Sequence, residues 1–306
     1  MQIASDAPAT FRSSARRPGT LELLSTAFRE VMSRRRLIRY LVGAEIKKKG
    51  TDTVLGNVWW ILDPLMSLMV YVFVMTIVFA RKQEDFAVFL LAAMIPFKWF
   101  TQTLSDSVSA VVSQGQLIKQ IQFPKIVLPI VVNGAGLVNL AFGFGVLFAV
   151  VLLWPGFADH LSYMILFVPL IAVIQFVLML GLSMFVAALT VFYRDIGIII
   201  GHVLRLLFYV APILWTFESA TGRGDLLRQE LGEVGFSLLR YNPVAVLLEA
   251  YRTCIYGVTK GESWAPASPA DLGWESLAIV LLISVVLLVL GTIVFKRLEP
   301  AFAKVL

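Results

Sequence analysis

Residues 163–192 read YMILFVPLIAVIQFVLMLGLSMFVAALTVF, which is an apolar stretch without a single charged side chain. An α-helix crosses the hydrocarbon core of a bilayer with roughly 20 apolar residues, so this stretch predicts a transmembrane helix. Further apolar stretches predict membrane spans at Val58–Ala80, Phe86–Val112, Ile126–Leu153, Ile196–Trp215 and Leu277–Phe295. The expected fold class is therefore an all-α integral membrane protein with six transmembrane helices.

The composition supports this class and excludes several others. Of the 306 residues, 58% are hydrophobic and 15% are charged, whereas soluble domains have about 45–50% apolar and 25% charged residues. So few charges cannot cover a water-facing surface, which excludes a soluble enzyme, a disordered protein and a secreted module. The single cysteine, Cys254, excludes a disulfide scaffold and a multi-cysteine metal cluster.

Three regions follow one another along the chain. Residues 1–18 are rich in Ala, Ser, Pro and Arg and have no apolar signal-peptide core, so we expect a disordered cytoplasmic tail. Residues 19–57 should hold an amphipathic interface helix over Gly19–Tyr40, followed by a basic juxtamembrane segment. The same helix could instead pack on a partner protein, and both can hold at once. Residues 58–306 form the transmembrane domain.

Positive charge gathers in the segments before the first span, between the second and third spans, and after the last span. The positive-inside rule then places both termini in the cytoplasm. The net charge of +6 therefore indicates contact with the cytoplasmic leaflet, not with nucleic acid. The residues expected at anionic lipid are Arg35, Arg39, Lys47, Lys48 and Lys49; a sharper alternative is that they capture a phosphate-bearing lipid headgroup.

A polar stripe runs along one face of the second predicted span. Thr101, Ser105 and Ser109 recur every four residues, and Asp106 flanks them. Such a stripe avoids lipid, so it either lines a hydrated path for a hydroxylated substrate or packs against other helices. Lys98 lies nearby in the sequence and favours the path.

Aromatic residues gather toward the span ends. Most of them should anchor the helices at the membrane interface. Some could line a pathway and stack on sugar rings; the candidates are Trp60, Trp99, Tyr209 and Trp215.

Pro243–Tyr256 is mostly apolar but too short to cross the bilayer, which suits a re-entrant or interfacial helix. Within it, Glu249 and Arg252 are spaced to pair on one helix face. We expect this pair to stabilise the helix; direct contact with substrate is the alternative.

Several chemistries are missing from the sequence. It contains no GxxxxGK[ST] phosphate loop and no HExxH motif. The few intramembrane acids form no chain of ionisable groups, as an ion-driven transporter would need. We expect neither catalysis nor a bound metal or cofactor in this chain.

Short fragments in a fixed order give the chain a family resemblance. They are Leu55-Gly56 with Trp59 and Pro64; Ile95-Pro96-Phe97 with Phe100; Leu117-Ile118-Lys119 with Phe123-Pro124 and Leu128-Pro129; Tyr193-Arg194-Asp195-Ile196; Ala211-Pro212-Ile213; and Asn242-Pro243 with Arg252. The chain resembles the permease subunit of ABC-2-type polysaccharide exporters, which move O-antigen, capsule, teichoic acid or cell-wall galactan. It departs from the family at Lys49-Gly50-Thr51-Asp52 and in a longer loop before Asn242.

The resemblance implies how such a protein would work. Two copies would form the pathway in a bacterial inner membrane, above two separate P-loop ATPase subunits that bind ATP and Mg²⁺. The cargo would be a polyprenyl-diphosphate-linked glycan. Contacts to the ATPase would come from Gln116, Leu117, Lys119, Gln122, Arg194 and Asp195, and the outer gate would include Asn242, Glu249 and Arg252.

One alternative function is an ABC-2 exporter of a drug or small lipid. A membrane-embedded glycan- or lipid-modifying enzyme is more remote, because the acidic residues are scattered.

Overall fold

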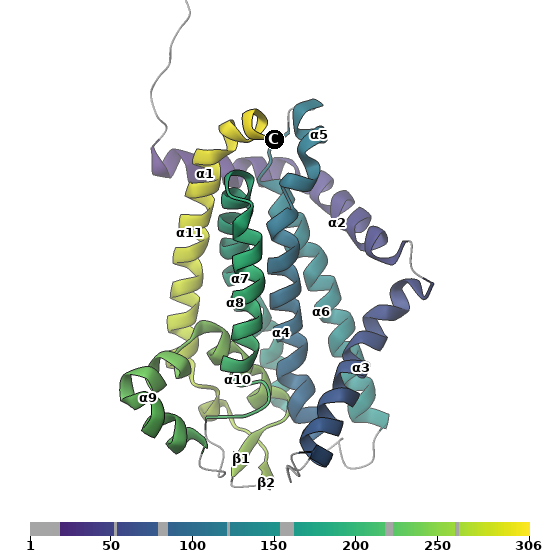
Figure 1. The fold of residues 1–306 in the computed structure, drawn as a ribbon, viewed down its shortest axis with the longest axis vertical. Coiled ribbons are helices and arrows are strands. Elements are labelled where there is room, and N and C mark those ends of the chain that lie inside the picture. The colour runs from purple at the N-terminus through teal and green to yellow at the C-terminus, as the bar shows by residue number, and fades with distance from the viewer. Residues whose placement is uncertain are drawn as a thin grey trace, which may run out of the picture.

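The computed structural model describes residues 19–51, 54–78, 85–120, 123–153, 162–217, 223–260 and 263–306. The predicted tail 1–18 and the predicted coupling residue Gln122 lie outside these ranges. Long helices run side by side between two ends of the molecule (Figure 1). We name them the α1 end, which also carries α5 and the C-terminus, and the hairpin end, which carries strands β1 and β2.

At the α1 end, the structure has two helices in the region where one helix, Gly19–Tyr40, was predicted. Helix α1 (Thr20–Ser33) lies across the bundle, and α2 (Arg35–Gly50) continues beyond the predicted end at Tyr40. α1 buries Leu23 and Ala27 but leaves Leu21 and Phe28 exposed. It therefore packs on its own bundle and still offers an apolar face, as an interface helix does.

Five helices are long and apolar enough to cross a membrane: Trp59–Val78, Phe86–Ser109, Val127–Leu153, Tyr163–Phe192 and Pro269–Val305. They correspond to α3 (Trp59–Val72) with the π-helix η2 (Phe73–Val78), α4 (Phe86–Ser109), α6 (Val127–Leu153), η5 (Tyr163–Phe167) with α7 (Val168–Phe192), and η6 (Pro269–Leu272) with α11 (Trp274–Val305). Short helices η1 (Gly56–Val58), η3 (Val112–Gln114) and α5 (Gly115–Gln120) lie between them.

The predicted span Ile196–Trp215 is shorter in the structure. Helix α8 runs from Asp195 to Val210, which is 16 residues. At 1.5 Å a residue it is about 24 Å long, less than the hydrocarbon core of about 30 Å. The described residues thus hold five helices of spanning length, and the predicted count of six is not confirmed.

The hairpin end contains more structure than the sequence suggested. Helix α9 (Arg223–Arg240) was not predicted, whereas α10 (Pro243–Ile255) matches the predicted short helix. Asn242 caps α10, because its side chain accepts a hydrogen bond from the Val244 amide at 2.9 Å, and Pro243 suits the first helical position. Strands β1 (Val258–Lys260) and β2 (Ser263–Ala265) form an antiparallel hairpin.

Helix α4 forms the centre of the bundle. Its residues from Val88 to Ala93 are completely buried, and helices α3, α6, α7, α8 and α10 contact it. This first part of α4 is apolar on every side, which suits such a position.

Helices α7 and α11 share the most extensive contact in the described part of the chain. Their backbones touch at Gly181 and Gly291: a Cβ on Gly181 would lie 2.6 Å from the backbone carbon of Leu287, and a Cβ on Gly291 would meet the carbonyl oxygen of Gly181. The approach therefore needs glycine at both positions.

We expect Gly181→Ala to lower the free energy of unfolding by about 1–3 kcal/mol, because the added methyl group must push the two backbones apart. Thermal unfolding of the purified chain, followed by size-exclusion chromatography, measures the effect. Gly145→Ala is the matched control, since a Cβ there meets nothing within 4 Å. Equal midpoints for the two variants would contradict the assignment of this contact.

Candidate functional site

A cavity of about 470 Å³ lies between α3, α4 and α6, closed on one side by the end of α2. Its lining includes Trp60 on α3, Trp99 and Thr101 on α4, and Lys49 on α2. The structure thus brings three residues of the predicted substrate path together with one residue of the predicted headgroup set. We call it the α3–α4–α6 cavity.

Two ion pairs lie at this cavity. The Lys98 ammonium is 2.7 Å from the Asp63 carboxylate and also donates to the Ser67 hydroxyl at 2.6 Å. The Lys49 ammonium is 2.6 Å from the Asp106 carboxylate, which also accepts a hydrogen bond from Gln102 at 2.8 Å. Pairing reduces the cost of holding charge at the depth of the spans, and partly exposed ionised groups there favour a hydrated cavity.

The predicted polar stripe faces out of the chain. Ser105 and Ser109 are exposed, while Thr101 and Asp106 are half-buried. Helix packing is served instead by Ser107, whose hydroxyl donates to the Ser183 hydroxyl of α7 at 2.9 Å. Packing within one chain therefore does not account for Ser105 and Ser109, whereas Thr101 lines the cavity and Asp106 pairs with Lys49.

The other predicted aromatic and basic residues lie away from the cavity. Tyr209 is 73% exposed on α8, and Trp215 follows α8 and packs edge-on against Phe217 with ring centroids 4.8 Å apart. The remaining residues predicted at lipid headgroups are exposed along α2; they are Arg35, Arg39, Lys47 and Lys48.

A hollow at the α1 end is lined by three of the six residues predicted to contact the ATPase. It measures about 650 Å³ and is lined by Gln116 and Lys119 of α5 and by Arg194. Asp195 is exposed beside Arg194 at the start of α8, and Leu117 belongs to α5. We call it the α5 hollow.

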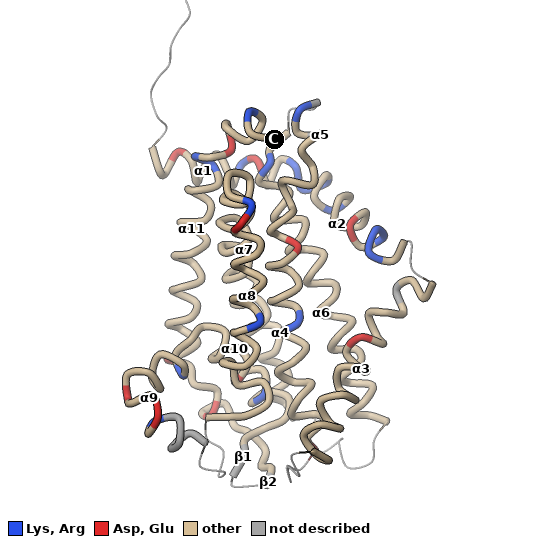
Figure 2. Tube along the Cα trace, in the orientation of Figure 1, with Lys and Arg blue, Asp and Glu red and all other residues tan. Residues whose placement is uncertain are grey.

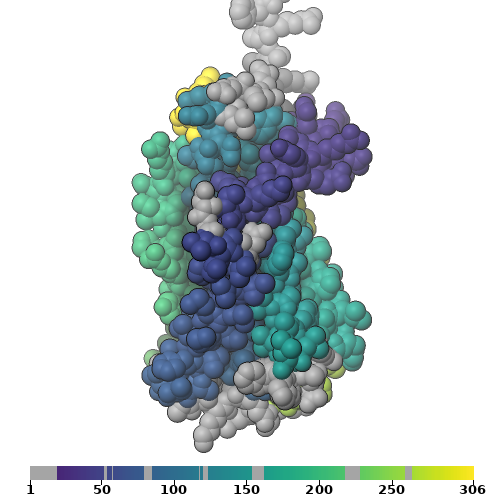
Figure 3. Space-filling model, turned by 90° about the vertical axis from the view of Figure 1, so that its right-hand side faces the viewer, coloured from purple at the N-terminus to yellow at the C-terminus, as the bar shows by residue number. Residues whose placement is uncertain are grey.

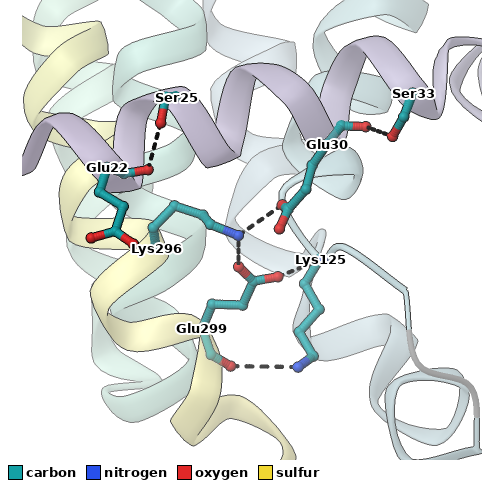
Figure 4. A network of polar contacts seen from close by, with 7 residues as sticks. All are labelled: Glu22, Ser25, Glu30, Ser33, Lys125, Lys296 and Glu299. Carbon is teal, nitrogen blue, oxygen red and sulfur yellow. Dashed lines mark hydrogen bonds and ion pairs between the residues drawn. The ribbon is translucent and has the colours of Figure 1, made fainter. Parts of the chain in front are cut away.

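An ion-pair network that was not predicted from the sequence lies at the α1 end (Figure 4). The Lys296 ammonium of α11 is 2.7 Å from Glu30 of α1 and 2.6 Å from Glu299. Glu299 also accepts a hydrogen bond from the Lys125 amide at 2.8 Å. The network therefore joins α1, α11 and the segment between α5 and α6. Only the Lys296/Glu299 spacing could have signalled it.

Arg252 of α10 connects the segment after α8 to α4 at the hairpin end. It is 2% exposed, and its guanidinium lies over the Phe89 ring of α4, 4.1 Å from the centroid. It donates to the carbonyl oxygens of Pro212, Ile213 and Trp215, and pairs with Glu249 at 3.2 Å. Arg252 therefore supplies hydrogen-bond partners to carbonyl groups of the non-helical segment that follows α8. This geometry supports the structural interpretation of the Glu249–Arg252 pair.

Residues 36–223 match the family described as ABC-2 type transporter. The chain belongs to the ABC-2 type transporter family. The matched region covers nearly all of α2 to α8, and it therefore includes the lining of the α3–α4–α6 cavity and most of the lining of the α5 hollow. The resemblance drawn from short fragments is confirmed.

Individual ABC-2 relatives match over nearly their whole length. An "O-antigen export system permease protein RfbA" of Klebsiella pneumoniae is 25% identical over 271 residues, which is 88% of this chain and 95% of the relative. A protein of the same name from Myxococcus xanthus is 26% identical over 276 residues, which is 90% of this chain and 97% of the relative.

Replacing Glu299 with Ala should destabilise the α1 end, because the part-buried Lys125 amide and the buried Lys296 ammonium each lose a partner. We expect a loss of about 1–3 kcal/mol in unfolding free energy. The measurement is thermal unfolding combined with limited proteolysis between α1 and α2, which should become faster. Glu22→Ala removes an exposed carboxylate from α1 and serves as control. Unchanged proteolysis in Glu299→Ala would show that the network does not hold α1.

Proposed function

We propose that this chain is the permease subunit of an ATP-driven exporter that carries a lipid-linked polysaccharide across a bacterial inner membrane. The observation that carries the proposal is the match, over about nine tenths of the chain, to permeases named for O-antigen export. Hydrolysis of ATP with Mg²⁺ belongs to a separate P-loop subunit, consistent with the missing phosphate loop. This chain then contributes the pathway and no catalytic residue.

The sidedness of the proposal follows from the distribution of charge. Lys and Arg gather on α1, α2, α5 and the last turns of α11, all at the α1 end (Figure 2). By the positive-inside rule this end faces the cytoplasm. The hairpin end then faces outward, α8 with the segment after it makes the sixth crossing, and α10 is re-entrant.

The α5 hollow is the surface that suits the ATPase subunit. Gln116, Lys119 and Arg194 line it, and Asp195 is exposed beside it. Because the ion-pair network ties this region to α1 and α11, movement imposed at α5 reaches two further helices. Two permease copies would each dock one ATPase subunit.

The substrate would pass through the α3–α4–α6 cavity. Trp60 and Trp99 offer aromatic faces to sugar rings, and Lys49, together with the exposed basic residues of α2, offers cations to a diphosphate. Ser105 and Ser109 face out of the chain, so in a pair of copies they would line the shared pathway.

A small lipid is the second candidate cargo. An apolar groove of about 630 Å³ runs between α3 and α6, lined by residues such as Ile61, Leu65 and Phe142. Figure 3 shows this face, on which α3 and α6 lie side by side below α2. The groove suits an acyl or prenyl chain, which a glycolipid and a simple lipid share.

Purification of the chain from its native membrane tests the proposed function. We expect a P-loop ATPase to co-purify, and depletion of the chain to accumulate lipid-linked glycan on the cytoplasmic side. Accumulation of a lipid without sugar would instead favour the second candidate. An active complex without any ATPase would refute both.

Arg194→Glu should weaken co-purification of the ATPase and slow export, because it reverses a charge at the α5 hollow. Arg228→Glu, on α9 at the hairpin end, is the matched charge reversal and should leave co-purification unchanged. Quantitative pull-down with a size-exclusion check of folding measures both. Equal losses in the two variants would contradict the docking assignment.

Replacing Ser105 and Ser109 together with Leu should slow export while leaving thermal stability unchanged, since both side chains are exposed and neither hydroxyl bonds to another helix among the described residues. Val285→Leu, at an exposed position of α11, is the control substitution. Normal export by the double variant would show that the stripe faces lipid and not the pathway.

A further inference from the structure

A second polar cavity lies at the hairpin end, separate from the α3–α4–α6 cavity. It measures about 370 Å³ and lies between the segment after α8, α10, η6 and the start of α11. Its floor includes the buried residues Thr216 and Arg252, and its rim includes the exposed residues Tyr241 and Asp271. The volume is at the lower end of the roughly 300–1,000 Å³ typical of small-molecule sites. It has room for one or two sugar rings and not for a polymer.

The charges around this cavity are balanced. Two arginines, Arg240 and Arg252, and two acidic residues, Glu249 and Asp271, are among the residues that line it. Balanced charge favours neither an anion nor a cation, so the lining suits a neutral polar ligand.

One buried hydroxyl at the cavity is unsatisfied. Thr216 is 6% exposed, and its Oγ1 has no hydrogen-bond partner among the described residues. Buried polar atoms without a partner are rare in folded proteins because each costs free energy. A ligand hydroxyl in the cavity would supply the missing partner.

Aromatic and further hydroxyl groups complete the lining. Phe217 and Tyr241 contribute rings, and Thr253 and Ser276 contribute hydroxyl side chains. An aromatic face packs against the apolar C–H face of a sugar ring while the hydroxyl groups bond its rim. Rings, hydroxyls and balanced charge together match the chemistry of a carbohydrate.

We propose that this cavity is a subsite for one or two neutral sugar residues. The inference rests on the proposed function for its outward orientation and for the source of the sugar, which is the exported glycan as it leaves the pathway. A free oligosaccharide outside the cell has the same chemistry, and the experiments below separate the two sources.

The test uses the full chain in lipid nanodiscs and saturation-transfer NMR with methyl glycosides of glucose, galactose, mannose and rhamnose. At least one glycoside should receive saturation. Thr216→Val keeps the shape of the side chain but removes the hydroxyl group, and we expect affinity to fall roughly tenfold. Thr216→Ser should retain binding.

Two further variants keep the test decisive. Thr292→Val removes another buried threonine hydroxyl, which donates to the Leu288 carbonyl and lies outside the cavity lining; its binding should be normal. Should Thr216→Val fold poorly by size-exclusion chromatography, Ser276→Ala takes its place and should also weaken binding. Failure of every glycoside to bind, equal binding by Thr216→Val and wild type, or displacement by inorganic phosphate would each overturn the proposal.

Export assays separate this proposal from the proposed function. Competition of free glycoside with export in reconstituted vesicles, lost in Thr216→Val, would assign the subsite to the exported glycan. Glycoside binding without such competition would overturn that source and favour a free oligosaccharide. Normal export by a chain that binds no glycoside would refute the subsite alone. Binding by a chain that supports no ATP-driven export would refute the proposed function alone.

Discussion

Polar groups within the hydrocarbon layer must find partners inside the protein, because lipid offers none. Arg252 shows how strongly this constraint shapes the chain. Its buried guanidinium donates to carbonyl groups of Pro212, Ile213 and Trp215, which lie just beyond the end of α8. Helix α8 can therefore stop after 16 residues, and α10 is bound to its end. The cavity at the hairpin end exists because these segments meet there.

The same constraint organises the α3–α4–α6 cavity. Lys98 and Lys49 each meet an aspartate, so charged groups lie among spanning helices without an uncompensated charge. The two ammonium groups are partly exposed, so an anion from outside can take the place of either aspartate. A site at which ion pairs can exchange partners is well suited to transient contact with a moving substrate and poorly suited to tight binding.

Packed helices connect the two ends of the molecule. α11 carries Lys296 and Glu299 at the α1 end and Ser276 at the hairpin-end cavity, and it contacts α7 along its length. The backbone contact of Gly181 with Gly291 leaves little room for the two helices to slide. α7 and α11 therefore form a closely packed pair that extends from the α1 end to the cavity at the hairpin end.

The membrane class, the positions of most spans, the short helix after Asn242 and the family could all be predicted from the sequence. Each of these depends on local features: apolar runs of a given length and short fragments in a fixed order. The tertiary structure alone decided which polar residues meet. Lys49 pairs with Asp106, 57 positions away, and Lys125 reaches Glu299 across 174 positions. Helical periodicity says which residues share a face, but not which other helix that face will contact. For that reason the stripe of Ser105 and Ser109 was recognised from the sequence, while its outward direction, the shortness of α8 and the cavity around Thr216 emerged only from packing.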